Sequence, residues 1–256
     1  MSFRVSQPSF QSLYIEMRVN GMTIATGTAF VVSSTSGANF LLTNRHNVTG
    51  RNQVTGEILC KKTAAVPDSL LVWHNARSGL GEFIPIEIPL IRDDVSRWIQ
   101  HPTLQEAADF VAIPVELTED ISIYPYRTEY LSHMHIEPAQ TVSVVGFPFG
   151  ERTGRSFAVW ATGFVASEPE INHGGRPVFL IDCRSRRGQS GSPVILYQNG
   201  GGTITHGNGA LVASPVSRLL GIYSGRINEE SDLGVVWKTY AIAELVDYAS
   251  TLESAP

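Results

Sequence analysis

One serine of this chain stands in a turn that favours nucleophilic chemistry. Ser190 is the third residue of Gly-Gln-Ser-Gly-Ser-Pro, residues 188–193, directly before the apolar run at 194–197. Glycines beside a serine permit a tight backbone that projects the hydroxyl and lets backbone N–H groups converge on one point. The same letters also suit an ordinary turn between two strands, so the turn alone leaves both interpretations open.

A serine hydroxyl needs a neighbouring base before it can attack a carbonyl. His46 is the candidate base, because it follows the apolar run 40–42 where a strand gives way to a loop, and functional side chains concentrate in loops. Asp109 is the candidate that orients this base. It precedes the apolar residues 110–113, where an unpaired charge is costly.

Other groups of residues could carry chemistry, and each has a plainer interpretation. Asp93 and Asp94 could orient the base instead, but their polar surroundings predict the start of a helix. His133 and His135 could face one side of a strand as metal ligands, yet no further ligand stands at zinc spacing. The glycine-rich stretch 199–209 is predicted to be a flexible hairpin loop, because a phosphate cradle should open a helix. We expect neither a metal nor an organic cofactor.

The elements that must position these residues are mostly strands. Along 13–19 apolar and charged residues alternate, which is the period of a strand with one buried face. Asn-Gly at 20–21 then predicts a tight hairpin into a second strand over 22–32. Two prolines in the run 83–91 indicate an edge strand or an irregular segment. Further strands are predicted at 40–43, 110–115, 141–146, 156–166, 177–182, 193–197, 219–224 and 234–238.

Helices are few in the predicted pattern. One or two turns are predicted over 93–99, and an amphipathic helix over 240–252. The polar, irregular stretch 119–140 is predicted to connect two strand-rich halves. Many short strands with a late helix favour an all-β sandwich or barrel over alternating strands and helices.

The composition narrows the class of protein. A net charge of -5 gives no electrostatic footprint for nucleic acid, and no apolar run is as long as a membrane-spanning helix. The N-terminus lacks the apolar segment of a secretory signal. Cys60 and Cys183 are too few for a disulfide scaffold; they could pair with each other, but isolated buried thiols are expected. We therefore expect a cytoplasmic protein that binds neither nucleic acid nor membrane.

The order of His46, Asp109 and Ser190, with the residues around them, resembles the chymotrypsin-like, or trypsin-like, serine peptidases. The resemblance is closest to their bacterial high-temperature-requirement (Deg-type) branch, without its PDZ domain. It runs from about residue 27 to 246 and has several motifs. These are Phe-Leu-Leu-Thr-Asn-Arg-His at 40–46, Ala-Asp-Phe-Val-Ala-Ile at 108–113, Val-Gly-Phe-Pro-Phe-Gly at 145–150, Ile-Asp at 181–182, Leu-Gly-Ile-Tyr-Ser-Gly at 220–225 and Gly-Val-Val-Trp-Lys at 234–238.

The resemblance implies an all-β fold of two six-stranded antiparallel β-barrels with a short C-terminal helix. The N-terminal barrel would span 1–118 and carry His46 and Asp109. Residues 119–140 would connect the barrels, and 141–256 would form the second barrel, with Ser190, and the helix.

The resemblance also implies a serine endopeptidase acting on proteins or peptides through an acyl-enzyme. Ser190 would be the nucleophile, His46 the general base and acid, and Asp109 the group that orients the histidine. Backbone N–H groups of Gly188 and Ser190 would form the oxyanion hole. Two alternatives stay open: a catalytically silent trypsin-like binding module, and a protease with one dedicated substrate that a regulatory protein partner activates.

The specificity pocket implied by the resemblance has three walls, formed by the residues before Ser190, by 224–226 and by the strand near 234. Its substrate-binding residues would be Arg184, Ser224, Gly225, Arg226 and Gly234. An arginine at the pocket floor would favour acidic or polar side chains before the scissile bond.

Trypsin differs from this chain at one informative position. Where this chain has Gln189, trypsin carries an aspartate that pairs with a new N-terminus after cleavage. Neither that aspartate nor an Ile-Val-Gly-Gly-like cleavage site is present, so activity without N-terminal cleavage is expected. An α/β-hydrolase is excluded, because its histidine follows the serine.

Overall fold

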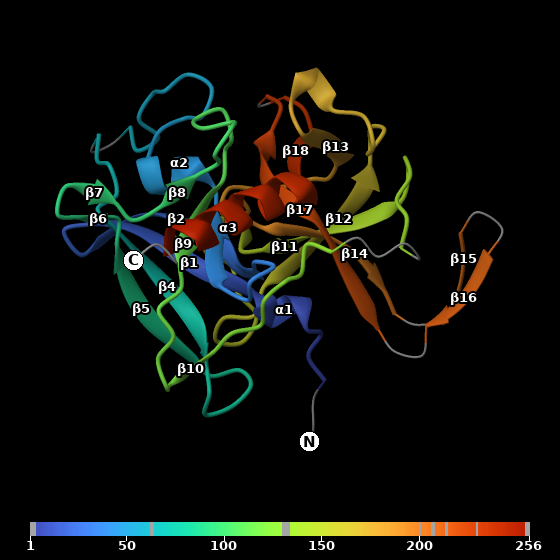
Figure 1. Ribbon diagram of the computed structural model, residues 1–256, viewed down its shortest axis with the longest axis horizontal. Helices are drawn as coiled ribbons and strands as arrows, with labels where there is room; N and C mark the ends of the chain where they lie inside the picture. The colour runs from blue at the N-terminus through green and yellow to red at the C-terminus, as the bar shows by residue number, and fades with distance from the viewer. Residues whose placement is uncertain are drawn as a thin grey trace.

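The computed structural model describes residues 4–61, 64–129, 134–199, 201–205, 208–212, 215–228 and 230–253. Two β-rich halves lie side by side (Figure 1). The N-terminal half, from blue to green, forms one large sheet, and the C-terminal half forms a closed barrel. A short helix, α1 (Pro8–Gln11), precedes the sheet. No helix in the described ranges is long and apolar enough to cross a membrane.

The first hairpin follows directly from its turn residues. Strands β1 (Ser12–Val19) and β2 (Met22–Ser33) pair antiparallel on either side of Asn20 and Gly21. Both turn residues are left-handed, with φ of 49° and 74°. This backbone matches the right-handed twist of the flanking strands, and Asn and Gly adopt it at least cost. The predicted hairpin is confirmed.

Among the described residues, the strands of the N-terminal half form a sheet without a closing ladder. Its strand order is β10-β4-β1-β2-β3-β9-β8, with β5 paired to β4. The bounds of the added strands are β3 (Asn39–Thr43), β4 (Ser69–Ala76), β5 (Phe83–Pro89), β8 (Ile99–Gln100), β9 (Val111–Pro114) and β10 (Ile121–Ser122).

The expectation of two closed barrels is therefore met only by the C-terminal half. In the N-terminal half, the described strands at the ends of this order, β8 and β10, are two residues long, and each pairs with one neighbour. The edge strand β5 contains Pro85 and Pro89, which have no N–H to donate to a further strand.

The predicted helix over 93–99 is wrong. Residues there form a small hairpin of β6 (Ile91–Arg92) and β7 (Val95–Ser96), followed by β8. Asp93 and Asp94 make its turn with φ of 51° and 62°, a conformation that Asp tolerates better than most residues. A two-residue turn of this kind needs both residues left-handed, which a helix start excludes.

The C-terminal half is a closed six-stranded antiparallel barrel. The ladder runs β11-β12-β13-β18-β17-β14 and closes on β11. Its strands are β11 (Thr141–Gly146), β12 (Val159–Val165), β13 (Val178–Asp182), β14 (Pro193–Gln198), β17 (Val216–Arg226) and β18 (Leu233–Lys238). Two short 3-10 turns, η1 (Pro148–Gly150) and η2 (His173–Gly175), lie in its loops.

The glycine-rich stretch after β14, predicted as a hairpin loop, contains a pair of strands. Strands β15 (Gly201–Thr205) and β16 (Asn208–Val212) pair with each other as a separate two-stranded sheet. In Figure 1 this hairpin stands away from the barrel at the right. Five consecutive ladder pairs join the two strands, so the predicted hairpin is present and its arms are paired.

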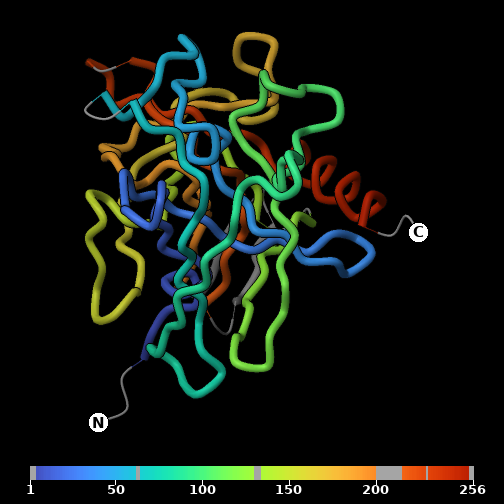
Figure 2. Tube along the Cα trace, turned by 90° about the vertical axis from the view of Figure 1, so that its left-hand side faces the viewer, coloured from blue at the N-terminus to red at the C-terminus, as the bar shows by residue number. Residues whose placement is uncertain are grey.

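Helix α3 (Thr239–Glu253) confirms the predicted C-terminal helix and joins the two halves. It leaves β18 of the barrel, yet Asp247 accepts hydrogen bonds from the backbone N–H and hydroxyl of Thr35 in the N-terminal half, at 2.8 and 2.9 Å. In Figure 2, α3 lies on the side of the molecule opposite the N-terminus. Its buried residues share one apolar cluster with both halves, which includes Phe30, Phe40, Phe110, Phe147, Ile222, Trp237, Ile242 and Leu245.

The stretch 119–140, predicted as a connection, contributes to the N-terminal half. Its β10 pairs with β4, and Tyr126 is buried in the cluster between the halves, with its N–H on the carbonyl of Val31 at 2.8 Å. The exact domain boundaries at 118 and 140 stay a prediction.

Candidate active site

The strand register brings His46 beside Asp109. Strands β3 and β9 pair with Thr43 opposite Val111, so the residues that follow β3 lie next to those that precede β9. The chain then turns into the single-turn helix α2 (Arg45–Thr49), with Asn44 as its extended N-cap residue. The side-chain amide of Asn44 donates to the carbonyl of Asp109 at 2.6 Å, which joins the two segments.

The imidazole of His46 is held by the carboxylate of Asp109. Nδ1 lies 2.8 Å from Oδ2 and 3.0 Å from Oδ1, and the backbone N–H of His46 donates to Oδ1 at 3.1 Å. Asp109 is buried, at 2% exposure, so its charge depends on these donors. A proton on Nδ1 leaves Nε2 as the ring's acceptor.

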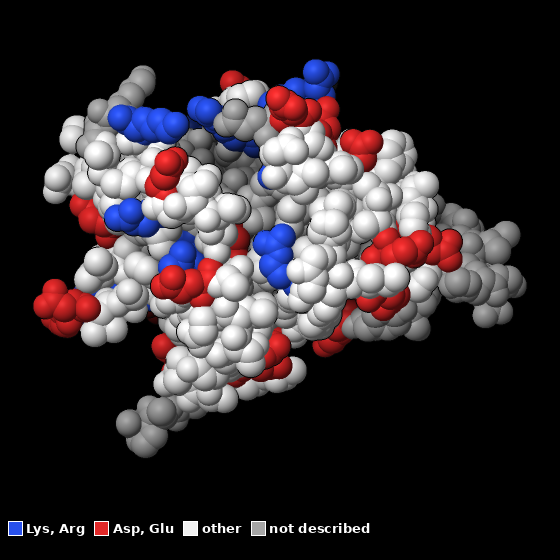
Figure 3. Space-filling model, turned by 90° about the horizontal axis from the view of Figure 1, so that it is seen from above, with Lys and Arg blue, Asp and Glu red and all other residues white. Residues whose placement is uncertain are grey.

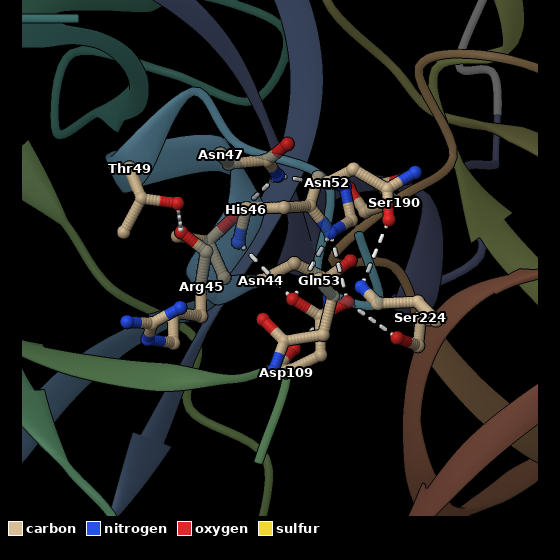
Figure 4. Close-up of polar contacts among 12 residues, drawn as sticks. Asn44, Arg45, His46, Asn47, Thr49, Asn52, Gln53, Asp109, Ser190 and Ser224 are labelled. Carbon is tan, nitrogen blue, oxygen red and sulfur yellow. Dashed lines mark hydrogen bonds and ion pairs between the residues drawn. The ribbon is translucent and has the colours of Figure 1, made fainter. Parts of the chain in front are cut away.

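Ser224 supplies a further donor to the same carboxylate. We expected it in the wall of a specificity pocket, but its hydroxyl hydrogen-bonds to Oδ2 of Asp109. In Figure 4 dashed lines join His46 to Asp109 and Asp109 to Ser224, with Ser190 beside the imidazole in this view. Ser224 comes from β17, so the barrel helps to hold a carboxylate of the N-terminal sheet. The signal in the sequence is a lone serine that interrupts the apolar run 219–223.

The turn around Ser190 is fixed between the two halves. The carbonyl of Ser190 accepts the N–H of Thr28 at 3.0 Å and the side-chain amide of Asn47, on α2, at 3.4 Å. Gly191 has φ of 84° and donates its N–H to the carbonyl of Tyr223 at 3.0 Å. A Cβ on Gly191 would overlap the carbonyl oxygen of Thr28. Within the described residues, no hydrogen bond joins Ser190 Oγ to the His46 ring.

Two carbonyl groups of the loop before Ser190 accept hydrogen bonds, which fixes the direction of the N–H groups that follow them. The carbonyl of Arg187 accepts the N–H of Phe149 at 2.6 Å, and that of Gln189 accepts the N–H of Ser192 at 3.0 Å. In a planar trans peptide the C=O and N–H point in opposite directions. The N–H groups of Gly188 and Ser190 therefore point away from these partners. An oxyanion hole needs two such donors.

Gly188 is the residue that this loop geometry requires. Its φ is 92°, and a Cβ there would overlap the carbonyl oxygen of Phe147. Its own carbonyl accepts a hydrogen bond of 2.8 Å from the hydroxyl of Thr28, a residue of β2. The same hydroxyl accepts the N–H of Phe147 at 3.2 Å. Thr28 thus holds the loop from the opposite half of the molecule.

Gln189 supports the loop from inside. Its side chain is fully buried, and Oε1 accepts the N–H of Arg186 at 2.7 Å. This neutral amide occupies the place where trypsin uses a charged aspartate and a new N-terminus. The loop before Ser190 is therefore stabilised by a hydrogen bond between two of its own residues, Arg186 and Gln189.

The expected pocket residues separate into two groups. Arg184 and Arg226 are exposed, and Gly225, with φ of 151°, lies at a register shift between β17 and β18. Ser185 and Gly234 instead contact the side chain of Tyr223. Figure 3 shows basic and acidic side chains as near neighbours on the face of the molecule seen from above.

The remaining sequence candidates lie apart from this site. Asp93 and Asp94 are exposed in their hairpin turn. Cys60 and Cys183 form no disulfide, as predicted, but only Cys183 is buried, whereas Cys60 is half-buried. His133 lies outside the described residues. Among the residues that are described, no three His, Cys, Asp or Glu side chains are placed to hold a metal ion.

Solved structures of serine proteases share this fold. The serine endoprotease from Yersinia pestis matches with a TM-score of 0.53 at 12% identity, over 93% of this chain and 63% of that chain. This chain therefore spans less than two thirds of the Yersinia protein. The Rv3671c protease in its inactive form matches with a TM-score of 0.50 at 15% identity, over 94% of this chain and 89% of that chain. A serine-to-alanine mutant of Rv3671c from M. tuberculosis H37Rv gives 0.50 at 17% identity, over 97% and 89%.

The sequence itself identifies the family. A comparison with curated protein sequences gives no match. A family model described as a trypsin-like peptidase domain matches residues 27–201, more than half of the chain. The range contains His46, Asp109 and Ser190, and the resemblance inferred from the motifs is confirmed. The chain belongs to the family of trypsin-like peptidase domains.

Proposed function

We propose that Ser190 is the nucleophile of this peptidase, with His46 as its base and Asp109 as the group that orients the base. The observation that carries the proposal is the two-oxygen contact of buried Asp109 with Nδ1 of His46, at 2.8 and 3.0 Å. This contact leaves Nε2 of the imidazole free to take a proton. Asn47, the residue after His46 in the same helical turn, donates its side-chain amide to the carbonyl of Ser190.

The proposed reaction proceeds through an acyl-enzyme. Ser190 Oγ attacks the carbonyl carbon of the scissile peptide, and Nε2 of His46 accepts the hydroxyl proton. The oxygen of the tetrahedral intermediate accepts hydrogen bonds from the N–H groups of Gly188 and Ser190. Collapse of the intermediate breaks the C–N bond, and His46 returns its proton to the leaving amine. A water molecule then attacks the acyl-enzyme by the reverse proton transfers and releases the acid.

The proposed substrates are proteins or peptides, and the full chain is proposed to act without prior cleavage. The support for the second statement is Gln189, whose amide closes the loop before Ser190 without a charged N-terminus. A regulatory partner that adjusts this loop is compatible with the same geometry.

A serine-directed fluorophosphonate tests the nucleophile directly. We expect one adduct, on Ser190, found by mass spectrometry of the intact protein and its peptides, and none in Ser190→Ala. Ser192→Ala is the matched control, because Ser192 lies two residues away but is fully buried. It should label like the parent. An adduct on another serine would contradict the assignment, and no adduct at all would favour a silent binding module.

A further inference from the structure

The backbone of Tyr223 is hydrogen-bonded to the turn that carries Ser190. Its N–H donates to the carbonyl of Ser192 at 2.9 Å, and its carbonyl accepts the N–H of Gly191 at 3.0 Å. These two bonds join β17 to the Ser190 turn. The side chain of Tyr223 is 2% exposed and is one of the largest fully buried side chains of the protein.

The ring of Tyr223 extends between two other segments. Its hydroxyl hydrogen-bonds to Oγ of Ser185, in the loop before Ser190. On the other side, a Cβ added to Gly234 in β18 would lie 2.5 Å from Cε2 of the ring and 3.2 Å from Cζ and from the hydroxyl oxygen. The ring therefore lies against the Cα of Gly234, on the side where any larger residue would place its side chain.

These contacts locate the ring between three walls. The segment before Ser190, the end of β17 and the start of β18 are the walls of the substrate pocket that the resemblance implies. A pocket beside a nucleophile accepts a side chain only where the protein's own atoms leave room. Here an aromatic side chain of the protein already spans from β17 to Ser185.

We infer that Tyr223 fills the pocket next to Ser190, so the enzyme selects glycine, alanine or serine immediately before the scissile bond. The inference rests on the proposed function and names its substrate class. It replaces the expectation that Arg184 selects acidic side chains, because Arg184 is exposed while Ser185, next to it, is the residue that faces the ring.

The ring is held in place on every side that the structure describes. Ser185 is buried, at 3% exposure, so opening the pocket would separate a buried hydrogen-bonded pair. The rest of the ring belongs to the apolar cluster of the barrel, together with Val236, its cross-strand partner, and Cys183. Burial raises the pKa of Tyr223 to about 12, so the hydroxyl keeps its proton at neutral pH.

The experiment uses peptidyl diphenyl phosphonates that differ only in the side chain before the reactive phosphorus: Ala, Leu, Phe, Glu or Lys. The second-order rate of Ser190 modification is measured by mass spectrometry for the full chain and for Tyr223→Ala and Tyr223→Phe. The parent and Tyr223→Phe should react fastest with the Ala probe. In Tyr223→Ala the ratio of Phe-probe to Ala-probe rates should rise by about 10-fold or more. Tyr248→Ala, a partly exposed tyrosine on α3, is the matched control and should keep the parent's order.

The results distinguish a failure of the proposed function from a failure of the filled-pocket inference. A fluorophosphonate without a side chain should label the parent and every variant, and its failure on the parent would refute the proposed function. Labelling by that reagent together with a parent preference for Leu, Phe, Glu or Lys would overturn the filled pocket alone. An unchanged order in a labelled Tyr223→Ala would do the same. If Tyr223→Ala does not fold, the parent's own order of rates still decides.

Discussion

The two halves of this molecule close their cores in different ways. The barrel completes a ring of six ladders around its apolar cluster, whereas the N-terminal sheet ends in two-residue strands and stays open. Both nevertheless present polar side chains with defined contacts at their shared boundary. His46 and Asp109 come from the open sheet, and Ser190 and Ser224 from the closed barrel. The pairing of Thr43 with Val111 is enough to bring the proposed base, His46, beside Asp109. This placement does not require a closed barrel.

The largest expected effect tests whether the open sheet supplies the essential carboxylate. Asp109→Asn should lower kcat by about 10³–10⁴, because an amide next to Nδ1 favours the wrong imidazole tautomer. Steady-state kinetics on a peptide pool, with fluorophosphonate labelling rates, measures the loss. Near-normal turnover in Asp109→Asn would give the orienting role to another carboxylate.

The second prediction concerns the acid stability of the open sheet. His74, in β4, is 3% exposed, and burial lowers its pKa to about 4. The unfolded chain binds a proton near pH 6.5, so stability is complete above that pH and falls as the pH drops toward 4. At about 1.4 kcal/mol per pH unit, the loss is about 3 kcal/mol.

Urea unfolding between pH 7 and pH 4, on the parent and on His74→Leu, isolates this contribution. The difference in free energy of unfolding between the two proteins should shift by about 3 kcal/mol in favour of the variant as the pH falls. A constant difference across that range would show that His74 is protonated in the folded sheet.

The third prediction weakens the link between the halves. Thr28→Val keeps the shape of a fully buried side chain, but Gly188 loses a hydrogen-bond donor and Phe147 an acceptor. We expect a loss of about 1–3 kcal/mol in the free energy of unfolding and a lower kcat with little change in KM. Thr23→Val, an exposed threonine of the same strand, should stay within about 0.5 kcal/mol of the parent. Equal behaviour of the two variants would mean that Thr28 does not support the loop.

The smallest effect is expected at the rival carboxylates in the turn of the separate β6–β7 hairpin. Asp93→Asn and Asp94→Asn replace exposed turn residues with another type that tolerates left-handed backbone. Stability should change by less than about 0.5 kcal/mol, and turnover should not change. Thermal melts and kinetics check both values. A large drop in turnover in either variant would contradict the assignment of Asp109.

Local signals in the sequence predicted local structure well. Asn20-Gly21 fixes its hairpin through backbone preference, and the apolar period over 240–252 fits helix α3. The glycines at 188 and 191 indicate the tight turn, because each would overlap a carbonyl if it carried a Cβ. The contact of His46 with Asp109 was also expected, but from resemblance rather than from spacing alone.

Features that depend on distant partners were not predictable. Whether a sheet closes depends on the lengths of its last strands, and two-residue strands leave almost no pattern. Ser224 was expected on a pocket wall, and its neighbour Tyr223 was not among the expected pocket residues. Neighbours in a strand face opposite sides, so Ser224 reaches Asp109 while Tyr223 reaches Ser185. The three-dimensional position of β17, between the two halves, determines which residues Ser224 and Tyr223 contact, and the sequence pattern does not give that position.

Helix α3 has a mechanical consequence for the reacting groups. It is covalently continuous with β18 of the barrel, and its side chains bond to the other half, through Asp247 to Thr35 and through Glu244 to the hydroxyl of Thr103 at 3.1 Å. Separation of the two halves would require α3 to lose its buried contacts with one of them. The placement of Ser190, in the barrel, relative to His46, in the N-terminal half, therefore also depends on the contacts that α3 makes with both halves.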